Sequence, residues 1–122
     1  AVEVRLFDVR ATTGTKLATE LLDAAAFAAG SPTLNGTLMP AVAGALTYLK
    51  GLRPAHKAGF AFGSYGWGRG GPEEVEHYLQ TMKVELLRPV LKLNYKPTAA
   101  GLAECREAGR LLAQHARKIC PA

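Results

Sequence analysis

Apolar and polar residues alternate over most of the first nine positions of the chain. Val2, Val4 and Leu6 are separated by charged residues, and this period of two predicts a β-strand over residues 2–9. Residues 12–15, Thr-Thr-Gly-Thr, follow and offer a turn and helix caps. The next leucines recur at helical spacing as far as Asp23. The chain therefore begins with an expected strand followed by a helix.

The same alternation of expected strands and helices continues through the middle of the chain. A short apolar run predicts a strand over residues 24–29, and Pro40 suits the first turn of a helix that ends before Arg53-Pro54. A buried strand over residues 58–62 is expected to lead into a glycine-dense loop, residues 63–71. Pro72 then opens a helix with acidic residues in its first turn. The inner stripe of that helix is expected to be Val75, Tyr78, Leu79 and Met82.

The last strand is expected within residues 87–95, and Thr98 can cap the final helix. Gly109 in the middle of this helix suggests a close approach to the sheet. The inner stripe of the helix is expected to be Leu102, Cys105, Gly109, Leu112, Ala116 and Ile119. The order of elements predicts an α/β fold, a doubly wound parallel sheet of about four strands and four helices, in a single domain over residues 1–122.

Composition and charge narrow the function classes. With 48% apolar and 20% charged residues the chain is ordinary globular protein, and no apolar run is long enough to span a membrane. The net charge of +5 would favour an acidic partner, but the basic residues near the end alternate with Glu104 and Glu107, which argues against nucleic acid. The first residues form no secretion signal, so a cytoplasmic location is expected.

Histidine and cysteine point to no metal or disulfide chemistry. The three histidines, His56, His77 and His115, are isolated in the sequence and predict no metal site. Cys105 and Cys120 lie on one expected helix, about 22 Å apart at ~1.5 Å per residue, so we expect free, reduced thiols. No catalytic residue is predicted.

Two unusual loops follow expected strands, at the edge where parallel sheets bind ligands. The first contributes Ser31, Pro32, Thr33, Leu34 and Asn35, which could contact a planar ring with a polar edge, although many ordinary turns use the same residues. The second contributes Gly63, Ser64, Tyr65, Gly66 and Trp67. Two aromatics among glycines favour stacking on a flat ligand; packing on a neighbouring loop or a partner chain is the alternative.

Together these segments resemble a known family. The motif Gly-Ser-Pro-Thr-x-Asn at 30–35, the helix end at 48–54 and Gly-Ser-Tyr-Gly-Trp at 63–67 are similar to the flavodoxin-like domain of flavodiiron proteins. That resemblance implies FMN as cofactor, with both loops around the isoalloxazine ring, Asn35 near its polar edge and Trp67 against its face. It also implies a redox partner, rubredoxin or a flavin reductase, and a diiron domain that reduces oxygen or nitric oxide.

The sequence departs from that family in two ways. The diiron pattern is absent from this chain, so by itself it is not expected to be an enzyme. The first strand and the phosphate loop of the family also have no counterpart, because residues 12–15 follow what resembles the second strand. We therefore expect weak or absent FMN binding by this chain alone.

The unmatched first unit also leaves a question of strand pairing. We expect residues 2–9 to shift inward and pair with the strand at 24–29, or else a homodimer to exchange or pair edge strands. The alternative function is a fragment or degenerate flavodoxin-like scaffold that binds no flavin. A more distant one is an interaction domain for another planar ligand.

Overall fold

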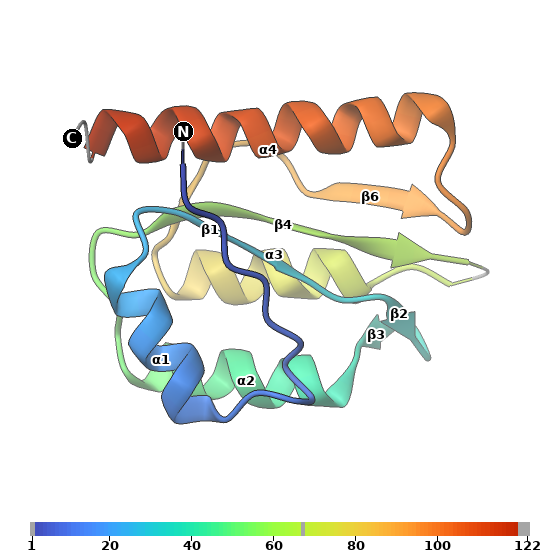
Figure 1. Ribbon diagram of the computed structural model, residues 1–122. Coiled ribbons are helices and arrows are strands. Elements are labelled where there is room, and N and C mark those ends of the chain that lie inside the picture. Colours follow the sequence, from blue (N-terminus) through green and yellow to red (C-terminus); the bar gives the residue numbers. More distant parts are fainter. Residues whose placement is uncertain (1, 67, 120–122) are drawn as a thin grey trace.

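The computed structural model describes residues 2–66 and 68–119 and has helices on both faces of a parallel sheet (Figure 1). The helices are α1 (Gly14–Asp23), α2 (Pro40–Gly51), α3 (Gly71–Thr81) and α4 (Ala99–Ile119). The strands are β1 (Phe27–Gly30), β2 (Thr33–Leu34), β3 (Thr37–Leu38), β4 (Ala58–Tyr65), β5 (Glu85–Leu86) and β6 (Leu91–Asn94). The predicted α/β class is confirmed.

Strand β4 is the centre of the main sheet. One side of β4 pairs with β1, from Phe27 opposite Gly59 to Gly30 opposite Phe62. The other side pairs first with β5 and then with β6, so a single edge is built from two short pieces. All of these pairs are parallel. The carboxyl ends of β1, β4 and β6 therefore meet at the same end of the sheet.

The two faces of the sheet are covered unequally. Helices α1, α2 and α3 lie on one side and enclose the larger core, whereas α4 lies alone on the other side (Figure 1). The larger core consists of Leu21, Leu38, Val42, Leu46, Ala61, Val75, Leu79, Met82 and Val84. Beneath α4 the buried cluster is only Phe60, Leu91 and Ala108, with Cys105 and Leu112 against it. Part of the α4 face is thus open to solvent.

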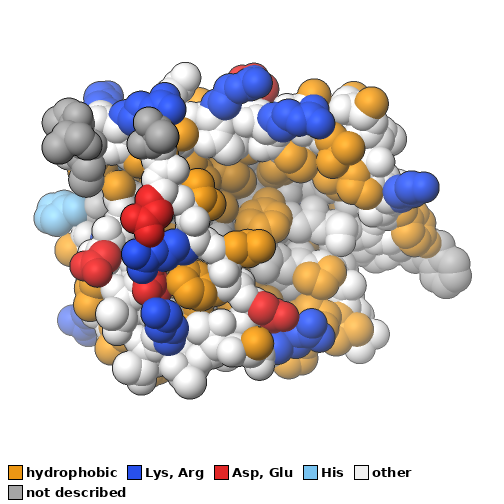
Figure 2. All heavy atoms as spheres, viewed as in Figure 1, with side chains coloured by type: hydrophobic (Ala, Val, Ile, Leu, Met, Phe, Trp, Pro, Cys, Tyr) orange, Lys and Arg blue, Asp and Glu red, His pale blue; other side chains and the backbone are white. Residues whose placement is uncertain are grey.

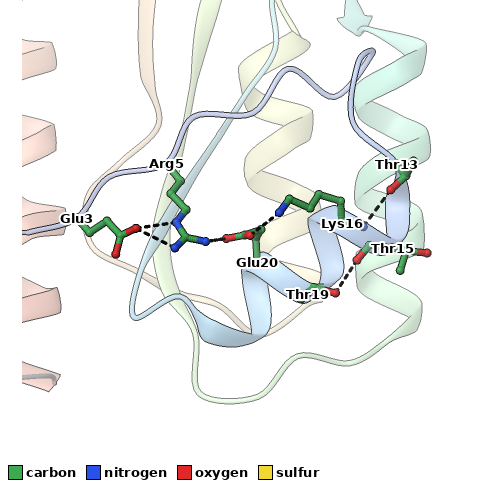
Figure 3. Close-up of polar contacts among 7 residues, drawn as sticks. All are labelled: Glu3, Arg5, Thr13, Thr15, Lys16, Thr19 and Glu20. Atoms are coloured by element: carbon green, nitrogen blue, oxygen red, sulfur yellow. Dashed lines mark hydrogen bonds and ion pairs between the residues drawn. The ribbon is translucent and has the colours of Figure 1, made fainter.

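The expected strand over residues 2–9 is wrong. These residues form no strand, and the side chains of Val4 and Leu6 are 84% and 93% exposed. In Figure 1 the segment runs across the direction of the strands, and Figure 3 shows that Arg5 is held instead by Glu20 of α1, 2.7 Å away. Alternation alone cannot form a strand, because its backbone groups need a neighbour to pair with.

The inward shift expected for residues 2–9 is therefore also wrong. Within the described part of the chain, β1 pairs with β4 alone, and its other edge has no neighbouring strand. The strand also begins at Phe27 rather than at residue 24. Ala24 is instead the C-cap of α1. Its amide donates to the Leu21 carbonyl, and its own carbonyl accepts from the Lys57 ammonium.

Two predicted loops contain regular structure. Strand β4 continues to Tyr65, so Gly63, Ser64 and Tyr65 belong to a strand and not to the glycine-dense loop. Residues 30–35 include β2, which pairs with β3 across a tight turn at Asn35 and Gly36. Both turn residues have positive φ, 52° and 76°, as an Asn-Gly hairpin turn of this kind requires.

The inner face of the final helix matches the prediction only in part, since Cys105 and Leu112 pack against the core as expected. Ala108 is 1% exposed, whereas a side chain at Gly109 would meet nothing within 4 Å. Leu102 and Ile119, expected to be buried, are 44% and 49% exposed. The predicted close approach at Gly109 is wrong, because the buried stripe passes through its neighbour.

Candidate functional site

A groove of about 320 Å³ lies at the carboxyl ends of β1, β4 and β6. Figure 2 shows a hollow beneath α4 with hydrophobic side chains exposed in it. The lining residues are Gly30, Ser31, Pro32, Phe62, Gly63, Ser64, Leu91, Leu93, Tyr95, Pro97 and Cys105. Four of the predicted site residues, Ser31, Pro32, Gly63 and Ser64, are therefore brought together there.

The hydroxyl of Ser31 holds the first loop in shape. Ser31 is 2% exposed, and its Oγ donates to the Pro32 carbonyl at 2.8 Å and accepts from the Met39 amide at 2.9 Å. Its own amide donates to the Phe62 carbonyl, which extends the pairing of β1 with β4. Because the hydroxyl is already satisfied, Ser31 offers a ligand mainly the backbone around it.

Thr33 joins the two predicted loops to each other. Its Oγ1 donates to the Ser64 carbonyl at 3.0 Å and accepts from the Gly71 amide, at the start of α3, at 3.1 Å. The sequence predicts that Thr33 contacts a ligand, but its hydroxyl instead fixes the distance between the first loop and the end of β4. A ligand between the loops would therefore meet a prepared site.

The close approach of the loops depends on Gly63. A Cβ on this residue would lie 1.9 Å from the Ser31 carbonyl oxygen, so no other residue fits without moving the first loop. The next residue, Ser64, is half-buried, and its side-chain hydroxyl makes no hydrogen bond to the described residues. Ser64 thus supplies the polar side chain that is free to meet a ligand.

Among the described residues, Leu34, Asn35, Tyr65 and Gly66 lie outside the groove lining. Leu34 is 41% exposed on the hairpin, and Asn35 forms its turn. Tyr65 lies beneath the guanidinium of Arg69, whose carbon is 4.9 Å from the centre of the ring. Gly66 packs against Tyr95. Trp67 lies outside the described residues, so its predicted position on the ring face stays a prediction.

Sequence reasoning missed the apolar part of the groove. Phe62 is 39% exposed although it lies on the central strand, and Leu93 and Tyr95 follow Leu91 on the same face of β6 and just beyond it. The period of two in residues 91–95 places these side chains on one face. It could not indicate that α4 leaves this end of the face uncovered.

Beside the groove, an ion pair links β6 to α3. The ammonium of Lys92 donates to Oε2 of Glu73 at 2.9 Å. This hydrogen bond lowers the pKa of Glu73 from its ordinary value, against the opposing effect of desolvation. The pair fixes β6, which carries one wall of the groove, to the first turn of α3.

Residues 12–15 lie elsewhere. They form the start of α1, where Thr13 caps the helix and a Cβ added to Gly14 would lie 3.1 Å from the ring of Tyr48 in α2. None of the four lines the groove. They provide no anion site for a ligand bound between the loops.

Comparison with known proteins decides the family. A family model described as flavodoxin matches residues 1–109. The chain belongs to the flavodoxin family. Its homologues include the nitric oxide reductase of Moorella thermoacetica, 40% identical over 112 residues. Another is the rubredoxin-oxygen oxidoreductase of Megalodesulfovibrio gigas, 34% identical over 111 residues. Each alignment covers 91% of this chain and 28% of the relative.

Solved structures agree with this membership of the flavodoxin family. Rubredoxin oxygen:oxidoreductase from Desulfovibrio gigas superposes with a TM-score of 0.89 at 33% identity, covering 97% of this chain and 29% of that one. A flavodoxin from the domain Archaea gives 0.72 at 27% identity and covers 91% and 73%. The homologues are thus flavodiiron proteins, matched through their flavodoxin-like region.

The family match covers only part of the flavodiiron relatives. This chain spans a little over a quarter of the length of those it matches. Within residues 2–66 and 68–119, no three His, Cys, Asp or Glu residues gather closely enough to hold a metal ion. No helix in the same ranges is long and apolar enough to cross a membrane.

Proposed function

We propose that this chain holds the isoalloxazine ring of FMN in the groove between the loop that follows β1 and the carboxyl end of β4, as part of an electron-transfer domain of a flavodiiron-type protein. The observation that carries the proposal is the link between the first loop and the end of β4. Thr33 fixes them to each other at the carboxyl end of a parallel sheet, which is where ligands bind in folds of this kind.

The lining of the groove fits a flat, mostly apolar ring with a polar edge. Phe62, Leu93 and Tyr95 supply apolar surface, and the hydroxyl of Ser64 supplies a polar group. The volume of about 320 Å³ is near the lower end of the range for small-molecule sites, roughly 300–1,000 Å³. When bound, the ring would accept and give up electrons, while these residues hold its orientation and exclude water.

The phosphate of FMN does not fit the described residues in the same way. A bound phosphate needs several amide or hydroxyl donors, usually at the start of a helix. The capped start of α1 is away from the groove, and the start of α3 has Glu73 and Glu74 in its first turn. We therefore propose that this chain recognises the ring and contributes little to the phosphate.

Names of the relatives suggest the wider role. Nitric oxide reductase and rubredoxin-oxygen oxidoreductase are among the similar proteins. We propose that the domain passes electrons from a rubredoxin or a flavin reductase toward a diiron centre outside this chain that reduces nitric oxide or oxygen. The alternative, a scaffold without flavin, is favoured by one observation, the open edge of β1 beside the groove.

The test is a titration of the purified chain with riboflavin, which carries the ring without the phosphate. Trp67 is the only tryptophan, so we expect quenching of its fluorescence to report on the ring at this site. Phe62→Ala should weaken binding because it removes a large apolar side chain from the lining of the groove. Leu111→Ala on α4 is the matched control. The exposed fractions of Leu111 and Phe62 are nearly equal, 38% and 39%, but Leu111 does not line the groove.

The outcome separates the two functions. Saturable binding that Phe62→Ala weakens and Leu111→Ala leaves unchanged supports the flavin role. A chain that binds neither riboflavin nor FMN at millimolar concentration would overturn that role and leave the scaffold. Equal losses in the two variants would place the binding somewhere other than this groove.

A further inference from the structure

Tyr95 occupies an unfavourable backbone conformation immediately after β6. Its φ is +56°, in the left-handed region that residues other than glycine, asparagine and aspartate rarely adopt. Its amide still donates to the Tyr65 carbonyl at 2.8 Å, so the backbone is held in place by the end of β4. Arg53, His56 and Lys83 share this conformation, so the surroundings of the Tyr95 side chain must decide what it does.

The core does not account for that side chain. Tyr95 is 60% exposed, although Leu91, on the same face of β6, is buried and Leu93 is half-buried. A tyrosine that packed beneath α4 would be enclosed in the same way. Instead the residue lines the groove together with Pro97.

Gly66 allows the ring of Tyr95 to lie close to the second loop. A Cβ on Gly66 would be 3.0 Å from Cε1 and 3.1 Å from Cζ of the ring. The ring is therefore backed by the polypeptide of that loop on one side. Ser31 and Pro32 also line the groove, and their loop follows β1, which pairs with the opposite side of β4 from β6.

We propose that Tyr95 is a third contact to the flat ligand, an aromatic wall that stacks on a planar heteroaromatic ring bound in this groove. The inference rests on the proposed function, and it assigns ring recognition to the segment after β6 in addition to the loop after β1 and the end of β4. Offset stacking of two aromatic rings contributes enough to change affinity measurably.

The test compares three variants in the full chain by riboflavin titration and thermal unfolding. Tyr95→Gly removes the ring and relieves the backbone, so affinity should fall about two- to tenfold, equivalent to ~0.5–1.5 kcal/mol, while Tm stays level or rises. Tyr95→Phe keeps the ring and should bind like the parent. Lys83→Gly is the matched control, because Lys83 also has positive φ, 61°, and does not line the groove.

Opposite responses of affinity and stability distinguish a ligand contact from a structural role. Lys83→Gly should leave Tm level or raised and leave affinity unchanged. The inference is overturned if Tyr95→Gly binds riboflavin as tightly as the parent, or if it loses affinity only together with a fall in Tm. If the parent chain binds no flavin, the proposed function fails, and the assignment of Tyr95 fails with it.

Discussion

Thr33 and Ser64 are 31 positions apart and are joined by a hydrogen bond of 3.0 Å from the threonine hydroxyl to the serine carbonyl. The same hydroxyl accepts from the amide of Gly71, so one side chain ties together the first loop, the end of β4 and the start of α3. Both sides of the groove are thereby fixed in the protein's own fold. A ligand does not have to order them.

Replacing Thr33 by valine should destabilise the protein by about 1–3 kcal/mol, because a half-buried amide and a carbonyl lose their partner while the shape of the side chain is kept. Urea unfolding measures the change. Thr19→Val is the control, since its hydroxyl bonds only to the exposed Thr15 carbonyl one turn back, and it should change stability by less than ~0.5 kcal/mol. Equal effects of the two changes would contradict the role given to Thr33.

FMN and riboflavin should bind with similar, weak affinity, within about threefold of each other. A phosphate held by two charge-assisted hydrogen bonds would favour FMN by about a hundredfold or more, at roughly 1.5–3 kcal/mol each. Calorimetry with both ligands measures the ratio. Sub-micromolar affinity for FMN alone would mean that this chain does contain a phosphate site.

The unpaired edge of β1 should make the chain associate with itself as its concentration rises, because an exposed strand edge can pair with another chain. Ala28 is exposed on this strand, and Ala28→Lys should reduce association, whereas Ala103→Lys on the exposed side of α4 should not. Sedimentation velocity over a concentration series distinguishes them. A parent chain that stays monomeric throughout the series would contradict this expectation.

Glu20 should make stability depend on acid pH. Hydrogen bonds from Lys16 and Arg5 lower its pKa from 4.5 in the folded protein (Figure 3). Its contribution is therefore complete above that value and is lost as the pH falls through the lowered folded pKa. Glu20→Gln should be less stable than the parent near pH 7, and the difference should shrink toward about pH 2.5.

Unfolding of both proteins in urea across that pH range measures the difference for Glu20→Gln. Glu104→Gln is the control, because Glu104 is exposed on α4 and forms no ion pair with the described residues. A constant difference between Glu20→Gln and the parent at all pH values would show that the charge of Glu20 is not what matters.

Local signals were enough to predict most helices. Pro40 and Pro72 lie in the first turns of α2 and α3 as expected, and the Thr98 hydroxyl accepts from the Gly101 amide at the start of α4. These features depend on residues within one turn of each other, so the sequence contains them in full. The family motif likewise indicated the two loops that form the groove.

Features that depend on distant neighbours were predicted less well. Residues 2–9 alternate like a strand but have no partner strand among the described residues. The Thr33 hydroxyl bonds to backbone more than 30 positions along the chain. The exposure of Phe62 depends on where α4 stops covering the sheet. None of these relationships can be read from the periodicity of a single segment.

Every pair in the main sheet includes β4, and this has a consequence for how the chain folds. Strands β1, β5 and β6 each pair with β4 and not with one another. The sheet therefore cannot start to form before residues 58–65 are in place. Its contacts join parts of the chain that are far apart, which slows folding relative to a helical bundle of this size. Amide protons of β4 should accordingly exchange only through global unfolding, whereas the short flanking strands can open from their outer sides.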